Sequence, residues 1–216
     1  MSATINYYDV PLKELTSQNV QGLGSVFTDL ADVELELCQW PTLGKRSLIS
    51  QAGYGSVIEE EFKVYWRGTT ILSAGHQNAR GGVAGKVLVE PESNSQYALV
   101  HWLSAHLDAA EAFIPKNGEP SIFLVAPPKD DVQPEDFVAF YSDGSCGIYM
   151  HPGVWHTNPL TLSGQEVIYE RKQGSIYATV DCILPKECNT WLKIPLRKPT
   201  LQPQLDANQQ QEIIYS

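Results

Sequence analysis

The chain has 216 residues, enough for one sizeable hydrophobic core, and we expect a single domain. Its formal net charge of −10 and its pI near 4.9 repel phosphate backbones and anionic headgroups, which argues against nucleic acid and membrane surfaces as partners. No apolar run approaches the roughly 20 residues that span a bilayer, and the N-terminal sequence lacks the pattern of a secretory signal, so we expect a cytoplasmic protein.

The sequence before residue 57 predicts little regular structure. Residues 12–19 follow a proline and predict a helix of about two turns. The first long strand-like run, 57–66, falls within a stretch, 34–85, that we expect to form an insertion in the domain. At the end of this stretch, 80–85 is expected to be a loop because it is rich in glycine.

Short runs of β-branched and aromatic residues dominate the remainder. These predicted strands are 86–90, 96–104, 121–126, 136–141, 166–171, 176–184 and 191–194. Glycine-bearing turns at 116–120 and 142–145 separate them. Many short strands at this spacing are typical of an all-β sandwich or barrel, the group that includes the cupins. The last residues, 197–216, form a Gln- and Pro-rich C-terminal tail.

A first cluster of polar residues lies at the end of the run 96–106. Strict alternation places Ser104 and His106 on one face of this strand and His101 on the other. After a turn, the next strand is expected to begin near Glu111 and to bring its carboxylate beside His106 across a hairpin. An imidazole and a carboxylate suit Mn, Fe, Ni or Zn, but two ligands are too few for a tight site.

A second cluster supplies candidates for the third ligand. Pro152 and Gly153 form a turn, which is flanked by His151 and His156, and His156 opens the following strand. We therefore expect a divalent metal ion, either Ni, Mn, Zn or Fe, near these histidines.

Several aromatic and basic residues near these clusters have two interpretations each. Trp102 and Trp155 are expected to pack inside the barrel first and to form a cavity wall second. Tyr65 and Tyr149 are ordinary strand tyrosines or hydrogen-bond donors to a developing oxyanion. Lys116 is either solvated at its turn or within reach of a substrate carboxylate.

Two motifs carry a resemblance to a known superfamily. The spacing from His106 over Glu111 to Gly118 resembles the first cupin motif, and the run from Pro152 to His156 resembles the second. Position 104, where the first histidine of the motif usually lies, is a serine here. The resemblance implies a cupin-type double-stranded β-helix, or jelly-roll, barrel over residues 1–196 with few short helices. It also implies a ligand set of His106, Glu111 and His156.

More narrowly, the chain resembles ureidoglycolate lyases. The segments 112–115 and 151–160 match the two best-marked segments of that family, and 10–12 and 24–26 match its opening strand and turn. The family pattern has Glu at the position of Ser104, Gln at the position of Glu111, and two adjacent histidines where His156 is followed by Thr157. A carboxylate has thus moved from one site-facing position to the other.

This resemblance implies metal-assisted cleavage of a carbon–nitrogen bond in ureidoglycolate or a related ureido acid, giving glyoxylate and urea. His151 is the first candidate for the acid or base, with Tyr149 and Lys116 as alternatives. The substrate-binding candidates are Ser104, Trp102, Trp155 and Tyr65. A small-molecule substrate and a homodimer are expected. Two other hypotheses stay open: a non-catalytic cupin that binds a small acid or sugar, and another metal-cupin enzyme such as a dioxygenase or isomerase.

Overall fold

The computed structural model describes residues 5–38, 55–75 and 82–200. Its strands are β1 (Asn6–Asp9), β2 (Leu12–Glu14), β3 (Gly24–Phe27), β4 (Val57–Arg67), β5 (Thr70–Gly75), β6 (Gly82–Val89), β7 (Gln96–Val100), β8 (Trp102–His106), β9 (Glu111–Pro115), β10 (Ser121–Ala126), β11 (Val138–Ser142), β12 (Gly147–Met150), β13 (Trp155–His156), β14 (Leu160–Thr161), β15 (Val167–Gly174), β16 (Thr179–Ile183) and β17 (Thr190–Pro195). The helical pieces among these residues are η1 (Leu30–Asp32), η2 (Pro134–Asp136) and α1 (Leu184–Glu187).

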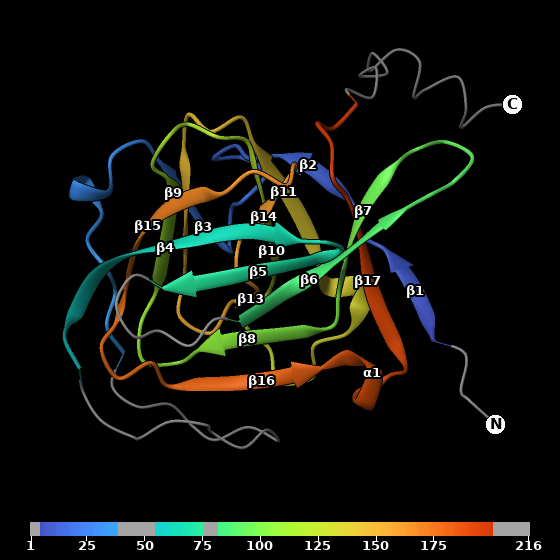
Figure 1. The fold of residues 1–216 in the computed structure, drawn as a ribbon. Coiled ribbons are helices and arrows are strands. Elements are labelled where there is room, and N and C mark those ends of the chain that lie inside the picture. Colours follow the sequence, from blue (N-terminus) through green and yellow to red (C-terminus); the bar gives the residue numbers. More distant parts are fainter. Residues whose placement is uncertain (1–4, 39–54, 76–81, 201–216) are drawn as a thin grey trace, which may run out of the picture.

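The strands form two sheets that enclose the interior of a barrel (Figure 1). The larger sheet has the strand order β1-β17-β7-β6-β5-β4-β15-β9-β12-β3, and the smaller has the order β16-β8-β13-β10-β11-β2, with β14 also paired to β10. Neighbours in both orders are often far apart in the chain. This arrangement confirms the predicted all-β, cupin-type jelly roll with few short helices.

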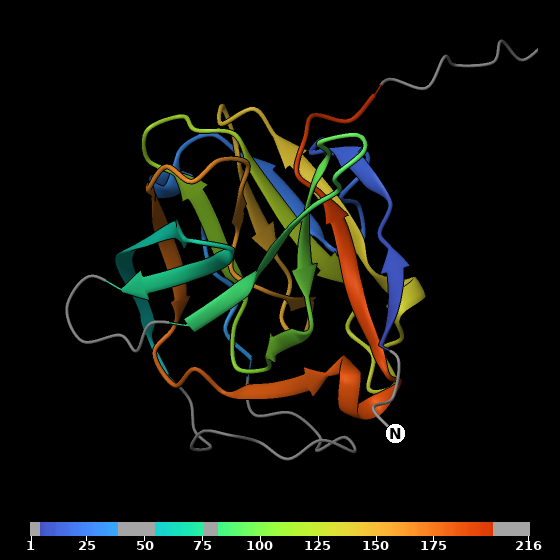
Figure 2. The ribbon, with the colours of Figure 1, turned by 45° about the vertical axis from the view of Figure 1, so that its right-hand side comes forward.

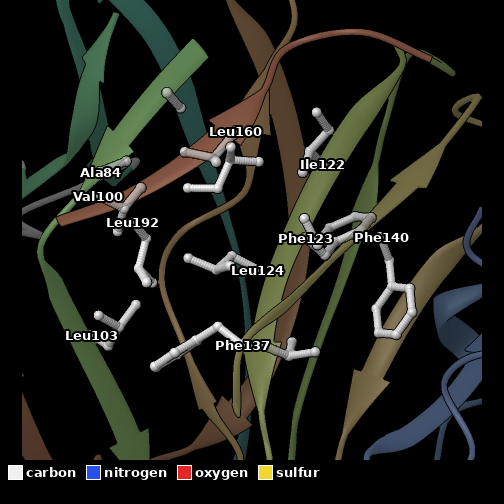
Figure 3. Packing of buried hydrophobic residues seen from close by; sticks show 14 of the residues in the cluster. Ala84, Val100, Leu103, Ile122, Phe123, Leu124, Phe137, Phe140, Leu160 and Leu192 are labelled. Atoms are coloured by element: carbon white, nitrogen blue, oxygen red, sulfur yellow. The ribbon is translucent and has the colours of Figure 1, made fainter. Parts of the chain in front are cut away.

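The core lies between the two sheets. Every residue of β10 is buried, and Leu124 on this strand is 1% exposed. Figure 3 shows Leu124 pointing from β10 into the space where Val100 and Leu192 of the opposite sheet lie. Burying one leucine side chain contributes about 1.5–3 kcal/mol, so this layer fixes how the two sheets sit against each other.

Two local predictions are wrong. The predicted helix at 12–19 is instead β2 followed by turns, because Leu12 to Glu14 pair in parallel with Ala139 to Tyr141 of β11. The predicted loop at 80–85 is instead the start of β6 from Gly82 onward. A Cβ at Gly85 would lie 3.0 Å from the carbonyl oxygen of Leu99, so this glycine allows close strand approach.

The stretch 34–85, predicted as an insertion, contributes strands of the larger sheet. β4 pairs along its length with β15, and β5 joins β4 to β6 (Figure 2). Residues 39–54 and 76–81 of this stretch, and 201–216 of the predicted tail, lie outside the described residues. No helix in the described part of the chain is long and apolar enough to cross a membrane.

Candidate active site and metal centre

A cavity of about 630 Å³ opens between the two sheets, and its wall includes residues from both. The chain passes from the larger sheet to the smaller at His101, which lies between β7 and β8. Beyond this break, Trp102, Ser104 and His106 line the cavity from alternate positions of β8. His101 also lines the cavity, although alternation alone placed it on the opposite face, because the change of sheet interrupts the alternation.

The three predicted metal ligands meet in this cavity. His106 ends β8, Glu111 begins β9 and His156 ends β13, and all three side chains are buried. The Glu111 Oε2 atom lies 3.4 Å from His106 Nε2 and 2.7 Å from His156 Nε2. One ligand atom from each residue lies within 4.8 Å of the others.

The route by which Glu111 reaches His106 differs from the prediction. β8 belongs to the smaller sheet, where it pairs with β13 and β16, whereas β9 belongs to the larger sheet, where it pairs with β12 and β15. The two strands therefore do not form a hairpin ladder. His106 and Glu111 meet across the barrel interior because the turn between β8 and β9 carries the chain from one sheet to the other.

Hydrogen bonds fix both imidazoles with the same nitrogen toward the cavity. The Nδ1 of His156 lies 2.9 Å from the carbonyl oxygen of Val154, which can only accept, so Nδ1 carries a proton. The Nδ1 of His106 lies 2.9 Å from Thr179 Oγ1, whose own proton is donated to the carbonyl of Tyr177. In the neutral state both Nε2 atoms therefore present lone pairs to Glu111, as ligating histidines do.

Burial and mutual charge set the protonation of this group. Burial lowers the pKa of His106 to about 4. Burial also lowers the pKa of His156, but the adjacent Glu111 carboxylate outweighs this effect and the net shift is upward. Burial raises the pKa of Glu111, but the two imidazoles outweigh it and the net shift is downward, so the carboxylate is ionised.

The donor set fits a divalent metal ion. Glu111 Oε2 is buried and accepts no aligned hydrogen bond from any described residue, despite its short contact with His156. Two imidazoles and a carboxylate oxygen thus converge in one buried spot, where a divalent cation would replace the proton that the raised pKa of His156 keeps beside Glu111. Two nitrogens and one oxygen are borderline ligands suited to Ni, Mn, Zn or Fe.

The second oxygen of Glu111 is held by a buried arginine that the sequence analysis did not single out. The Nη1 atom of Arg171 lies 3.4 Å from Glu111 Oε1, and its Nη2 atom pairs with Glu60. Alternation along β15 gives a signal for this residue, because Val167, Tyr169 and Arg171 share one buried face. An arginine on the apolar face of a strand needs an internal partner.

A loop after β15 brings a further unpredicted residue to the cavity wall. The ring of Tyr177 lies over that of His106, with 4.1 Å between the centroids, and the Arg171 guanidinium lies beside its hydroxyl. Asp108, which is buried, accepts hydrogen bonds from the backbone N–H groups of Tyr177 and Ala178. Tyr177 has a positive φ of 56°, which the sequence does not reveal, since this conformation depends on Asp108.

The predicted substrate-binding residues divide into two groups. Ser104 and Trp102 line the cavity, and Ser104 Oγ donates a 2.8 Å hydrogen bond to Asp181. Trp155 is buried and its indole N–H donates to the carbonyl of Lys129, so it packs in the barrel wall. Tyr65, which is half-buried on β4, is not among the described residues that line the cavity.

The three predicted acid or base residues lie outside the cavity wall. Lys116 is exposed and pairs with Glu61 on the outer face of the larger sheet. The exposed His151 packs against the edge of the Tyr149 ring, and its Nδ1 atom is 3.9 Å from Glu36. The structure thus brings none of the three to the metal ligands, and His151 does not fill the position that Ser104 leaves without a histidine.

A double-sheet barrel with two histidines and a carboxylate gathered in its cavity defines a cupin-type protein. The ureidoglycolate lyase family model matches residues 49–182, more than half of the chain. A ureidoglycolate lyase of Azotobacter vinelandii is 28% identical over 122 residues, which cover 51% of this chain and 71% of that protein. A ureidoglycolate lyase of Pseudomonas savastanoi pv. phaseolicola is 39% identical over 64 residues, which cover 30% of this chain and 38% of that protein. The chain belongs to the ureidoglycolate lyase family and is an enzyme of the lyase class.

Proposed function

We propose that this enzyme cleaves the carbon–nitrogen bond of ureidoglycolate or a related ureido acid, giving glyoxylate and urea, with the help of one divalent metal ion. The observation that carries the proposal is the convergence of His106, Glu111 and His156 in one cavity. Membership of the ureidoglycolate lyase family supports the choice of reaction.

His106, Glu111 and His156 would hold the ion. When bound, such an ion lowers the pKa of a coordinated hydroxyl and binds the adjacent carboxylate. Arg171 holds the second oxygen of Glu111, which turns the free oxygen toward the two imidazoles. The cavity wall contributed by the buried Phe113 excludes part of the water from the reacting bond.

Cleavage requires one proton to leave the substrate hydroxyl and one to reach the departing nitrogen. Ser104 lines the cavity and hydrogen-bonds to Asp181, so this pair can accept the hydroxyl proton as the carbonyl forms. Burial raises the pKa of Tyr177 to about 12, so its hydroxyl stays protonated at neutral pH and can donate to the leaving urea. The two transfers balance, and no oxidant or reductant is consumed.

The test is glyoxylate release from racemic ureidoglycolate, corrected for the spontaneous rate. The wild-type enzyme is loaded with Ni, Mn, Zn and Fe in turn. At least one of these ions should support glyoxylate release above the spontaneous rate. His156→Ala should lower the rate by about 100-fold or more. Lys116→Ala is the matched control, because Lys116 lies outside the cavity and the variant should keep the wild-type rate. A wild-type rate equal to the spontaneous one would contradict the proposal.

A further inference from the structure

The cavity extends well beyond the three metal ligands. Trp102, Ser104 and His106 line it from one face of β8, and a strand rises about 3.4 Å per residue. The backbone positions of Trp102 and His106 are therefore roughly 13 Å apart along the strand. We call the region of His106, Glu111 and His156 the ligand end, and the region of Trp102, His101, Trp191 and Lys86 the aromatic end.

Planar side chains stack at the aromatic end. The imidazole of His101 is stacked on the indole of Trp191, with 4.2 Å between centroids and 24° between planes. Trp102 contributes a second indole that is 48% exposed. An exposed indole beside a stacked pair offers a surface for another planar group, because aromatic rings gain dispersion energy when a second ring covers them.

Unused hydrogen-bond donors lie at the same end. The buried indole Nε1 of Trp191 has no hydrogen-bond partner among the described residues. The ammonium of Lys86 lies 5.7 Å from the centroid of the Trp191 ring and forms no ion pair with a residue in 5–38, 55–75 or 82–200. The Nε1 atom of Trp191 is buried from solvent, so the group that a ligand can reach at this end is the exposed ammonium of Lys86, which matches an anionic acceptor.

Ureidoglycolate is too small to use both ends. It has about nine non-hydrogen atoms, whereas a cavity of 630 Å³ falls in the range that holds drug-sized ligands. With its reacting carbon at the ligand end, the molecule would leave the aromatic end in contact with water alone. The aromatic end therefore matches a part of the substrate that ureidoglycolate does not have.

We propose that the preferred substrate is an extended ureido acid whose distal nitrogen carries a planar group with a carboxylate or similar acceptor. The reacting α-hydroxy acid lies at the ligand end, and the planar group stacks at the aromatic end beside Lys86. This inference rests on the proposed lyase function. The bond broken is still the one between the α-carbon and the proximal nitrogen, and the products are glyoxylate and the substituted urea.

The kinetic test compares three substrates by kcat/KM for glyoxylate release: ureidoglycolate, its N-phenyl derivative and its N-(4-carboxyphenyl) derivative. The carboxyphenyl compound should exceed ureidoglycolate by about tenfold or more, with the phenyl compound between them. Lys86→Gln should remove the advantage of carboxyphenyl over phenyl. Lys63→Gln is the matched control, because Lys63 pairs with Glu166 on the outer surface, and it should keep the wild-type ratio.

A binding test keeps this inference separate from the proposed reaction. Calorimetry with 4-ureidobenzoate, the expected product, should show binding that Trp191→Leu weakens by about tenfold, with the fold of the variant checked by circular dichroism. Ureidoglycolate cleaved as fast as both derivatives, or no binding of the product, would overturn the extended substrate alone. Binding of the product without cleavage of any of the three would overturn the lyase function and leave the aromatic end as a ligand site.

Discussion

Glu111 is the residue on which the site is built. One carboxylate oxygen faces two imidazoles, and the other faces Arg171. Both histidines and Glu111 were predicted from the sequence because their spacing follows two short motifs. Arg171 and Tyr177 were not, because their role depends on the pairing of β15 and on a loop conformation held by Asp108.

Replacing Tyr177 by Phe tests its role as proton donor. The variant keeps a ring over His106 but loses the hydroxyl beside Arg171. We expect kcat for ureidoglycolate to fall by about 100-fold, with KM changed little, since general acid catalysis contributes on this order. Tyr149→Phe, which lies outside the cavity wall, should behave as wild type. A Tyr177→Phe enzyme with the wild-type kcat would exclude the assigned role.

His101 makes the stability of the protein depend on acidity. Burial, and then the charge of Lys86, lower the pKa of His101 in the folded state below 6.5. A depressed pKa means that the unfolded chain binds the proton more tightly than the folded chain. His101 therefore leaves the free energy of unfolding unchanged above about pH 6.5 and lowers it as the pH falls below this value. His101→Phe keeps a ring on Trp191 but cannot titrate.

We therefore expect the melting temperature of His101→Phe to fall less than that of wild type between pH 7 and pH 5. The melts are recorded with a chelator, so that metal release does not contribute. An equal fall in melting temperature in the two proteins would show that folding does not lower the pKa of His101.

At the scale of elements, the turns were easier to predict than the short strands. The glycine-bearing turns at 116–120 and 142–145 are present, with positive φ at Gly118 and Gly144. A strand was expected to open at His156, whereas β13 ends there, and β14 was not predicted, because such two-residue pieces are strands only through pairing with β8 and β10. The change of sheet at His101 depends on barrel closure, which local alternation cannot show.

The contact between these two turns predicts a large effect of Gly144→Ala. A Cβ at Gly144 would overlap the backbone of Gly118, in addition to the strain of a positive φ. Urea unfolding should show a loss of about 2–4 kcal/mol. Gly22→Ala is the control, because Gly22 has a φ of +82° but no atom within 4 Å of an added Cβ. It should lose only about 1–2 kcal/mol, and an equal loss in both variants would exclude the steric contribution.

For the whole molecule, the barrel explains why residues distant in sequence share one site. The metal ligands come from three strands, and the arginine behind them comes from a fourth. The all-β cupin-type architecture followed from the strand pattern and the motif resemblance. The packing order of the sheets did not, because the stretch 34–85 was expected to form an insertion, whereas its strands β4 and β5 lie within the larger sheet. The homodimer remains a prediction.

The most direct measurement is the metal content of the purified protein after equilibration with each divalent ion and removal of the excess. We predict one ion per chain for the wild type, by elemental analysis, and less than about a tenth of an ion for Glu111→Ala, because loss of the carboxylate leaves two neutral ligands. A wild type that retains no ion, or a Glu111→Ala variant that retains a full equivalent, would contradict the account.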